Sequence, residues 1–184
     1  MASYNEGKDF IVDWICDRVP QGGRVLDVGA CDGKWADLIS EKRPDIFLDA
    51  CEIFKPNVAS IMLKYDNLFV GDIYNYWYRP NYYDIVIFGD VIEHMTVERA
   101  QQVLHYARWN ATDYVVGVPF NYPQGALYGN KWERHIQADL TPELFDERYP
   151  HHELIIQPRD DYAYYHDAYG VPEGLKSAHS ATNV

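Results

Sequence analysis

Short apolar runs alternate along the chain with segments whose apolar residues recur at helical spacing. The runs that predict buried strands are Arg24–Val28, Asp45–Ile53, Asn67–Val70, Asp84–Phe88 and Tyr114–Val118. The segments that predict helices are Lys34–Lys42, Asn57–Lys64, Val97–Trp109 and an opening helix whose apolar stripe comprises Phe10, Ile11, Trp14 and Ile15. Such alternation favours a doubly wound α/β fold with a parallel sheet and right-handed crossovers.

The pattern changes after the fifth predicted strand. A loop rich in Gly, Asn and Pro leads to Thr141, a typical N-cap residue for a short helix. His152–Gln157 and Tyr162–His166 then predict a closing antiparallel pair. We therefore expect a seven-stranded, mostly parallel sheet with an antiparallel last strand and helices on both faces. It would form a single domain over residues 1–170, with a flexible tail over residues 171–184.

Charge and hydropathy narrow the class of partner. The 16 basic and 28 acidic side chains give a net charge of −12, which repels nucleic-acid phosphates and anionic membranes. No apolar run could span a membrane or has signal-peptide length at the start of the chain. Three cysteines without metal-type spacing fit a reducing compartment, so we expect a cytoplasmic protein. The sequence leaves the oligomeric state open.

Tyrosine is frequent, with 16 residues, and much of the excess lies in Tyr74–Tyr83 and Tyr162–Tyr169. A tyrosine ring is apolar while its hydroxyl is polar. These residues could line a pocket or a protein contact, or they could cover the sheet, and both interpretations stay open.

A glycine-containing loop, Asp27-Val-Gly-Ala-Cys-Asp-Gly33, follows the first predicted strand. Glycines permit a tight turn and let a ligand approach the backbone beside the N-terminus of the next helix. A dinucleotide fingerprint that began at Gly29 would need glycines where Cys31 and Lys34 stand. A P-loop would need Ser or Thr in place of Trp35. The spacing therefore disfavours a nucleotide-dependent oxidoreductase.

The same loop resembles the first motif of class I S-adenosylmethionine (SAM)-dependent methyltransferases, Asp/Glu-x-Gly-x-Gly-x-Gly. Asp27, Gly29 and Gly33 match this motif, and Cys31 replaces its middle glycine. The resemblance covers roughly Arg24 to His166 and implies a Rossmann-like fold with SAM as the cofactor.

Three later positions support the resemblance, and each lies at or just after the end of a predicted strand. Glu52 is placed to accept hydrogen bonds from both ribose hydroxyls. Asp72 stands where the family accepts from the adenine amino group, and Asp90-Val-Ile-Glu-His-Met95 resembles a stretch common in small-molecule methyltransferases, including quinone-biosynthesis O-methyltransferases. The resemblance thus implies a cofactor site made of Asp27, Gly29, Ala30, Gly33, Glu52, Ile53, Asp72, Ile73, Asp90 and Val91.

Methyl transfer requires an aligned nucleophile and, for a hydroxyl, often a base. His94 is the candidate base because imidazole titrates near neutral pH, and Glu93 and His135 are further catalytic candidates. Alternatively, Glu93 and His94 only shape the methionine end of the cofactor pocket.

The loop after the fifth strand contains Gln124, Asn130, Glu133 and His135. Their spacing looks like the Gln…Gly-Asn-x-x-Glu-x-His pattern of a set of small bacterial class I methyltransferases. These side chains could contact a substrate, since long loops at a strand edge often set specificity, or they could pin the loop over the cofactor.

A metal ion is a further alternative. Small-RNA 3′-end 2′-O-methyltransferases have a similar Glu-x-x-Glu-His motif and a later His that hold a divalent metal over a vicinal diol. Asp90, Glu93, His94 and His135 resemble that set. The Asp in place of the first Glu, the acidic surface and the lack of an RNA-binding region argue against it. We therefore assign no metal ligands, and a sugar or other small diol would suit such a site better than RNA.

Taken together, these features predict a methyltransferase that transfers a methyl group from SAM to an oxygen or nitrogen of a small molecule. One alternative is an inactive binding or regulatory protein that retains the fold. The other is a metal-assisted O-methyltransferase acting on a vicinal diol. The acceptor itself does not follow from fold or cofactor site, because it is bound by variable loops.

Overall fold

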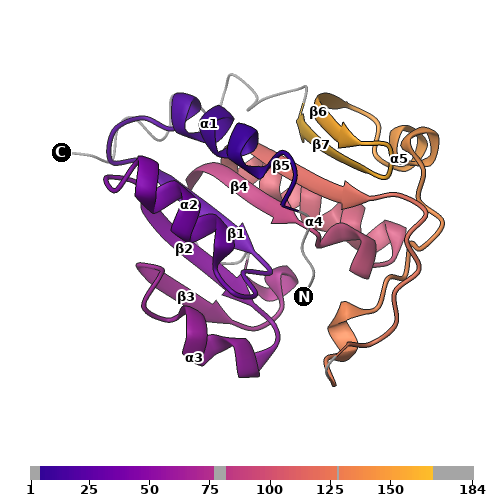
Figure 1. Ribbon diagram of the computed structural model, residues 1–184, viewed down its shortest axis with the longest axis horizontal. Helices are drawn as coiled ribbons and strands as arrows, with labels where there is room; N and C mark the ends of the chain where they lie inside the picture. The colour runs from indigo at the N-terminus through magenta and orange to yellow at the C-terminus, as the bar shows by residue number, and fades with distance from the viewer. Residues whose placement is uncertain (1–4, 77–81, 128, 168–184) are drawn as a thin grey trace.

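The computed structural model describes residues 5–76, 82–127 and 129–167 (Figure 1). The strands are β1 (Arg24–Val28), β2 (Phe47–Glu52), β3 (Asn67–Val70), β4 (Tyr83–Gly89), β5 (Ala111–Pro119), β6 (His152–Arg159) and β7 (Tyr162–Asp167). The helices are α1 (Lys8–Arg18), α2 (Lys34–Lys42), α3 (Val58–Ile61), α4 (Val97–Asn110) and α5 (Pro142–Arg148). Short 3₁₀ helices are η1 (Lys55–Asn57), η2 (Ile73–Asn75), η3 (Ile92–His94) and η4 (Lys131–Glu133).

The seven strands form one sheet in the order β3-β2-β1-β4-β5-β7-β6. Neighbours from β3 through β5 pair in parallel, and β7 is antiparallel to both β5 and β6. The expected mostly parallel sheet with an antiparallel last strand is therefore confirmed. Strand order reverses between β1 and β4, and a doubly wound sheet opens a ligand crevice at the carboxyl ends of such strands.

Helices cover both faces of the sheet, as expected (Figure 1). Successive residues of a strand point to opposite faces, so Val25 and Ile85 pack with α1, α2 and α3 on one side. Leu26 and Val86 pack with α4 and α5 on the other side. The two cores fix the sheet from both sides and thereby fix the strand ends that surround the crevice.

The expected stripe of α1 is wrong in one respect. Phe10 is 50% exposed, whereas Lys8 is buried with its ammonium 5.1 Å from the centroid of the Trp35 ring. Positions 8, 11, 12 and 15 share a helix face at the period of 3.6, which turns Phe10 toward solvent. A lysine can occupy that buried face because its stem is apolar and its ammonium contacts an aromatic ring.

Element ends shift slightly from the expected positions. β2 begins at Phe47 because Asp45 is held in the preceding turn, where its carboxylate accepts from the backbone N–H of Gly22 and from Arg43. The helix expected over 57–64 is shorter, since its start is the 3₁₀ helix η1 and its α-helical part is only α3.

The described tyrosines of the two tyrosine-rich segments mainly cover the sheet. Tyr76, Tyr83, Tyr162, Tyr164 and Tyr165 are all buried in the two cores. Residues 77–81 and 168–184 lie outside the described residues, so the domain end at residue 170 and the tail over 171–184 stay predictions. Among the described helices, none has the length and hydrophobicity needed to cross a bilayer.

Candidate cofactor and acceptor site

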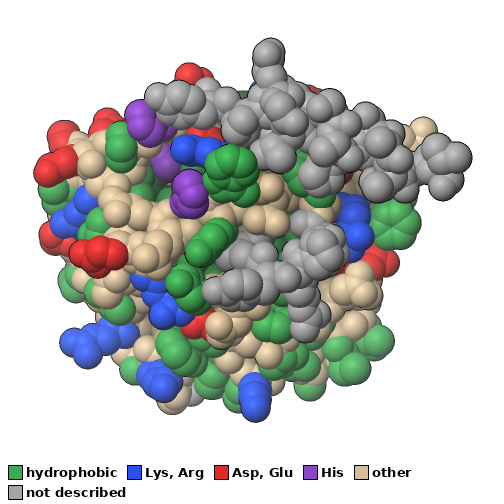
Figure 2. All heavy atoms as spheres, turned by 180° about the vertical axis from the view of Figure 1, so that it is seen from behind, with side chains coloured by type: hydrophobic (Ala, Val, Ile, Leu, Met, Phe, Trp, Pro, Cys, Tyr) green, Lys and Arg blue, Asp and Glu red, His purple; other side chains and the backbone are tan. Residues whose placement is uncertain are grey.

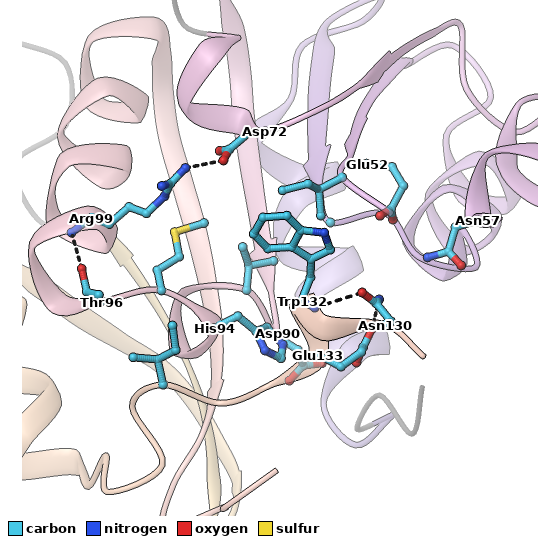
Figure 3. Close-up of a pocket in the computed structure, with 15 residues that line it drawn as sticks. Glu52, Asn57, Asp72, Asp90, His94, Thr96, Arg99, Asn130, Trp132 and Glu133 are labelled. Carbon is cyan, nitrogen blue, oxygen red and sulfur yellow. Dashed lines mark hydrogen bonds and ion pairs between the residues drawn. The ribbon is translucent and has the colours of Figure 1, made fainter. Parts of the chain in front are cut away.

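A cavity of about 260 Å³ lies at the carboxyl edge of the sheet (Figure 3). Four parts of the chain form its walls, and one of them is the end of η1, which contributes Asn57. The strand ends contribute Gly29, Glu52, Ile53, Asp72, Asp90 and Val91. The segment from η3 into α4 contributes His94, Met95, Thr96 and Arg99, and the loop after β5 contributes Asn130, Trp132, Glu133 and Ile136.

The other expected cofactor residues do not line the cavity. Asp27, Ala30, Gly33 and Ile73 are not among its lining residues. Asp27 is buried in β1, where its Oδ2 accepts a 2.5 Å hydrogen bond from the Tyr65 hydroxyl. Burial raises the pKa of Asp27 to about 7. This position indicates that Asp27 supports the first loop from behind and does not contact a ligand in the cavity directly.

The first loop turns through left-handed backbone at each of the three positions where the motif has glycine. Gly29 has φ 74° and Gly33, the N-cap residue of α2, has φ 77°. A Cβ at Gly29 would lie 2.9 Å from Cγ2 of Val91, so glycine is also required there for space. Cys31 has φ 51° although it has a side chain.

Glu52 holds this loop through its carboxylate. Its Oε2 accepts from the backbone N–H of Cys31 at 2.8 Å, and its Oε1 accepts from that of Phe54 at 2.6 Å. A carboxylate has about four lone-pair positions, so each oxygen can accept a further hydrogen bond from a ligand. Glu52 therefore both shapes the loop and faces the cavity (Figure 3).

Asp72 forms an ion pair with Arg99, which reaches it from the first turn of α4 (Figure 3). The other oxygen, Oδ1, accepts from the backbone N–H of Tyr74 at 3.0 Å. Nothing in the sequence pattern singles out Arg99, because its position depends on how α4 packs beside the strand ends. The pair places both a carboxylate and a guanidinium on the cavity wall.

Glu93, His94 and His135 come together beside the cavity. The Nε2 atoms of His94 and His135 lie 3.8 Å and 4.0 Å from Oε1 of Glu93, and the two imidazole centroids are 4.8 Å apart. His94 lines the cavity, while Glu93 and His135 lie behind it. The three catalytic candidates thus form one cluster at the wall made by η3 and the loop after β5.

Backbone carbonyls fix the orientation of both imidazoles. Nδ1 of His94 lies 3.2 Å from the carbonyl oxygen of Arg134, and Nδ1 of His135 lies 2.6 Å from that of Tyr122. A carbonyl can only accept, so each Nδ1 carries the proton and each Nε2 presents a lone pair. Burial lowers the pKa of His94 to about 4 and lowers that of His135, so both rings are neutral near pH 7.

Burial and the nearby charge of Asp90 raise the pKa of Glu93 well above its ordinary value. Glu93 is fully buried, and neither carboxylate oxygen has a hydrogen-bond partner among the described residues. A buried carboxyl group without a partner is energetically costly, which marks this cluster as more than a packing feature.

The polar residues of the loop after β5 largely pin the loop. Asn130 donates to Oε1 of Glu133 at 3.1 Å and accepts from the backbone N–H of Trp132, and Gln124 donates to the carbonyl of Glu133 at 2.7 Å. Asn130 and Glu133 also line the cavity, so for them pinning and ligand contact are compatible.

Gln137 anchors the loop, although no sequence pattern points to it. Its buried side chain donates to the carbonyls of Ile92 and Met95 and accepts from the Tyr149 hydroxyl. The backbone N–H groups of Ile136 and Gln137 both donate to the carbonyl of Glu93. These bonds lock the segment that contains His135 against η3.

No family model matches the chain, and no curated protein matches its sequence. Solved structures do match it. The N-terminal domain of EvdMO1, in the presence of SAH and D-fucose, has a TM-score of 0.64 at 11% identity over 89% of this chain and 83% of its own. A TehB-like SAM-dependent methyltransferase from Corynebacterium glutamicum has a TM-score of 0.60 at 13% identity over 90% and 89%.

A third match is the magnesium protoporphyrin IX methyltransferase ChlM from Synechocystis PCC 6803 with bound SAM. Its TM-score is 0.57 at 17% identity, over 86% of this chain and 76% of its own. The chain has the class I SAM-dependent methyltransferase fold. The Rossmann-like architecture expected from the sequence is thereby confirmed.

Proposed function

We propose that the protein is a SAM-dependent methyltransferase that methylates an oxygen or nitrogen of a small molecule. One observation carries this proposal. The cavity at the carboxyl edge joins the backbone of Gly29 to the carboxylates of Glu52, Asp72 and Asp90, which are the residues that the methyltransferase motifs single out. The similarity to solved methyltransferases supplies the fold on which these positions have a defined arrangement.

The charge of the cavity suits SAM better than a nucleotide with a pyrophosphate. SAM presents ribose hydroxyls, an adenine amino group and a sulfonium cation, whereas Glu52, Asp72 and Asp90 supply acceptors and negative charge. Among the described lining residues, Arg99 is the only Lys or Arg, and it is already paired with Asp72. A pyrophosphate would be repelled by this wall.

Each wall residue has a role that its environment supports. Glu52 would accept from the ribose, Asp72 would accept from the adenine, and apolar side chains such as Ile53 and Val91 would enclose the ligand. Bound SAM supplies an activated methyl group, so the chain needs mainly to align the acceptor and exclude water. His94 lies on this wall with its pKa lowered to about 4 by burial, so it would orient the acceptor through its Nε2 lone pair rather than remove a proton from it.

A binding protein without turnover is the main competing function. It would be favoured if Trp132 filled the cavity, but a cavity of about 260 Å³ remains with Trp132 in place on its wall (Figure 3). The net charge of −12 favours a small-molecule acceptor over nucleic acid, because phosphates are repelled. On the face that Figure 2 shows, the basic side chains are scattered and do not form a patch that could bind phosphates.

Equilibrium unfolding with S-adenosylhomocysteine (SAH), NAD or buffer alone tests the cofactor. At one hundred times its dissociation constant, SAH should raise the free energy of unfolding by about 2.7 kcal/mol, and NAD should have no effect. Glu52→Gln should weaken SAH binding by about 10- to 100-fold because charge-assisted hydrogen bonds are lost. Glu41→Ala, an exposed change on α2, is the matched control and should bind SAH like the wild type. Absence of any SAH effect on the folded wild type would contradict the proposal.

A further inference from the structure

The buried carboxylate of Glu93 requires an explanation. It is fully buried, has no hydrogen-bond partner among the described residues, and points Oε1 at two imidazoles that are too far away to donate to it. Both imidazoles carry their proton on Nδ1, which leaves Nε2 without a hydrogen to donate. With Glu93 ionised, its Oε1 and the two Nε2 atoms are therefore three lone-pair donors that face one another.

A cation would satisfy all three groups at once. The donor atoms of Glu93, His94 and His135 lie within 4.8 Å of one another. Around a four-coordinate ion with ligand bonds of about 2.0–2.1 Å, donor atoms stand about 3.3 Å apart. The observed 3.8 Å and 4.0 Å separations from Oε1 need to contract by less than about 1 Å to reach that spacing, and the separation between the two imidazole donors, at most 4.8 Å, by up to about 1.5 Å.

Neighbouring backbone groups hold Glu93, His94 and His135 in the positions that metal ligands would need. Metal-binding histidines usually donate their other ring N–H to a carbonyl or carboxylate, and here Arg134 and Tyr122 supply the carbonyls. The loop that contains His135 is tied to η3 by two backbone bonds to the carbonyl of Glu93. The three ligands are thus held in place by groups that do not themselves face the ion.

We propose that Oε1 of Glu93 and the Nε2 atoms of His94 and His135 bind a divalent first-row transition-metal ion, with an open position toward the cavity. Two imidazoles and one carboxylate favour ions such as Zn²⁺, Mn²⁺ or Fe²⁺ over Mg²⁺ or Ca²⁺, which take oxygen ligands. His94 reaches the cavity wall, so the open position is adjacent to the proposed cofactor site.

This ion narrows the acceptor class, and that part of the inference rests on the proposed function. A metal-bound hydroxyl has a lowered pKa and keeps lone pairs on oxygen for attack. An amine would give its one lone pair to the ion and lose its nucleophilicity. The site therefore favours a hydroxyl compound, and two adjacent hydroxyls would bind better than one.

Titration of the chelator-treated full chain with Co²⁺ alone, and then with Zn²⁺ alone, tests the site by calorimetry and by Co²⁺ absorption. We expect one equivalent to bind the wild type, and Glu93→Gln and His135→Gln each to weaken it by about 100-fold or more. His105→Gln, an exposed change on α4, should bind like the wild type. Two ligand variants are included because either substitution alone could disturb folding, which circular dichroism checks.

SAH binding by the same samples separates the two proposals. Folded wild type that binds SAH but no Co²⁺ or Zn²⁺ would overturn the metal site and leave the proposed function standing. Equal metal binding by Glu93→Gln, His135→Gln and wild type would overturn the ligand assignment. Catechol, as a diol probe, should change the absorption of bound Co²⁺; an unchanged spectrum at saturating catechol would overturn the hydroxyl-acceptor inference.

Discussion

The backbone N–H of Cys31 donates to Oε2 of Glu52 at 2.8 Å, which ties the first loop to the end of β2. Cys31 stands where the methyltransferase motif has glycine, and it keeps the left-handed backbone with φ 51°. A residue with a Cβ pays about 1–2 kcal/mol for that conformation, and the hydrogen bond to a buried carboxylate offsets part of this. At this position the motif has a glycine, which adopts such a backbone without strain; here the hydrogen bond to Glu52 holds the loop in that conformation instead.

Substitution of Cys31 tests this relationship. Cys31→Gly removes the Cβ penalty, so SAH affinity should change by less than about threefold. Cys31→Val should destabilise the protein by about 1–2 kcal/mol and weaken SAH, because β-branched residues tolerate a positive φ poorly. Urea unfolding and SAH calorimetry measure both effects. Equal behaviour of the two variants would show that the loop is not conformationally constrained at this position.

Asp27 should make stability depend on pH. The unfolded chain releases this proton near pH 4, while burial raises the pKa in the folded protein to about 7. The folded state thus binds the extra proton between these values, and the free energy of unfolding falls as pH rises from about 4 to 7, by up to a few kcal/mol. Asp27→Asn should lack this slope. Urea unfolding at several pH values, without ligand, measures the difference between wild type and variant, and parallel curves would refute the assignment.

Gln137 should be important for stability although it is not itself a residue of a recognised motif. Gln137→Leu leaves the carbonyls of Ile92 and Met95 and the Tyr149 hydroxyl without this partner. We expect a loss of about 2–3 kcal/mol in the free energy of unfolding. Gln101→Leu removes one exposed bond to the carbonyl of Arg148 and should cost less than about 1 kcal/mol. Similar losses for the two variants would argue against an anchoring role.

Trp132 should contribute to ligand binding more than to folding. Its side chain lines the cavity and is 43% exposed. Trp132→Ala should weaken SAH by about 2- to 10-fold through lost aromatic contact, while Trp132→Phe should retain most of the affinity. Trp109→Ala, with a similarly exposed tryptophan on α4, is the control. Unchanged SAH affinity in Trp132→Ala would place the ligand away from this wall.

Much of the cofactor wall could be anticipated, because parallel strands bring their carboxyl ends to one edge. Glu52, Asp72 and Asp90 each lie at or just after the end of a predicted strand, and all three line one cavity. Asp27 and Gly33 belong to the same motif but do not line the cavity. Asp27 is a buried residue of β1 and Gly33 is the N-cap residue of α2, so both support the loop from behind. Whether these residues bind SAM stays a prediction.

The sequence by itself determined the order and kind of the main elements, because strand and helix periodicities are local properties of the chain. It also determined which polar residues follow the strands. Tertiary structure decided what surrounds them. Arg99 meets Asp72 across 27 positions, and His135 meets Glu93 through backbone bonds between η3 and the loop after β5. Such contacts depend on the path of a loop and the packing of a helix, which the spacing of residues along the chain does not encode.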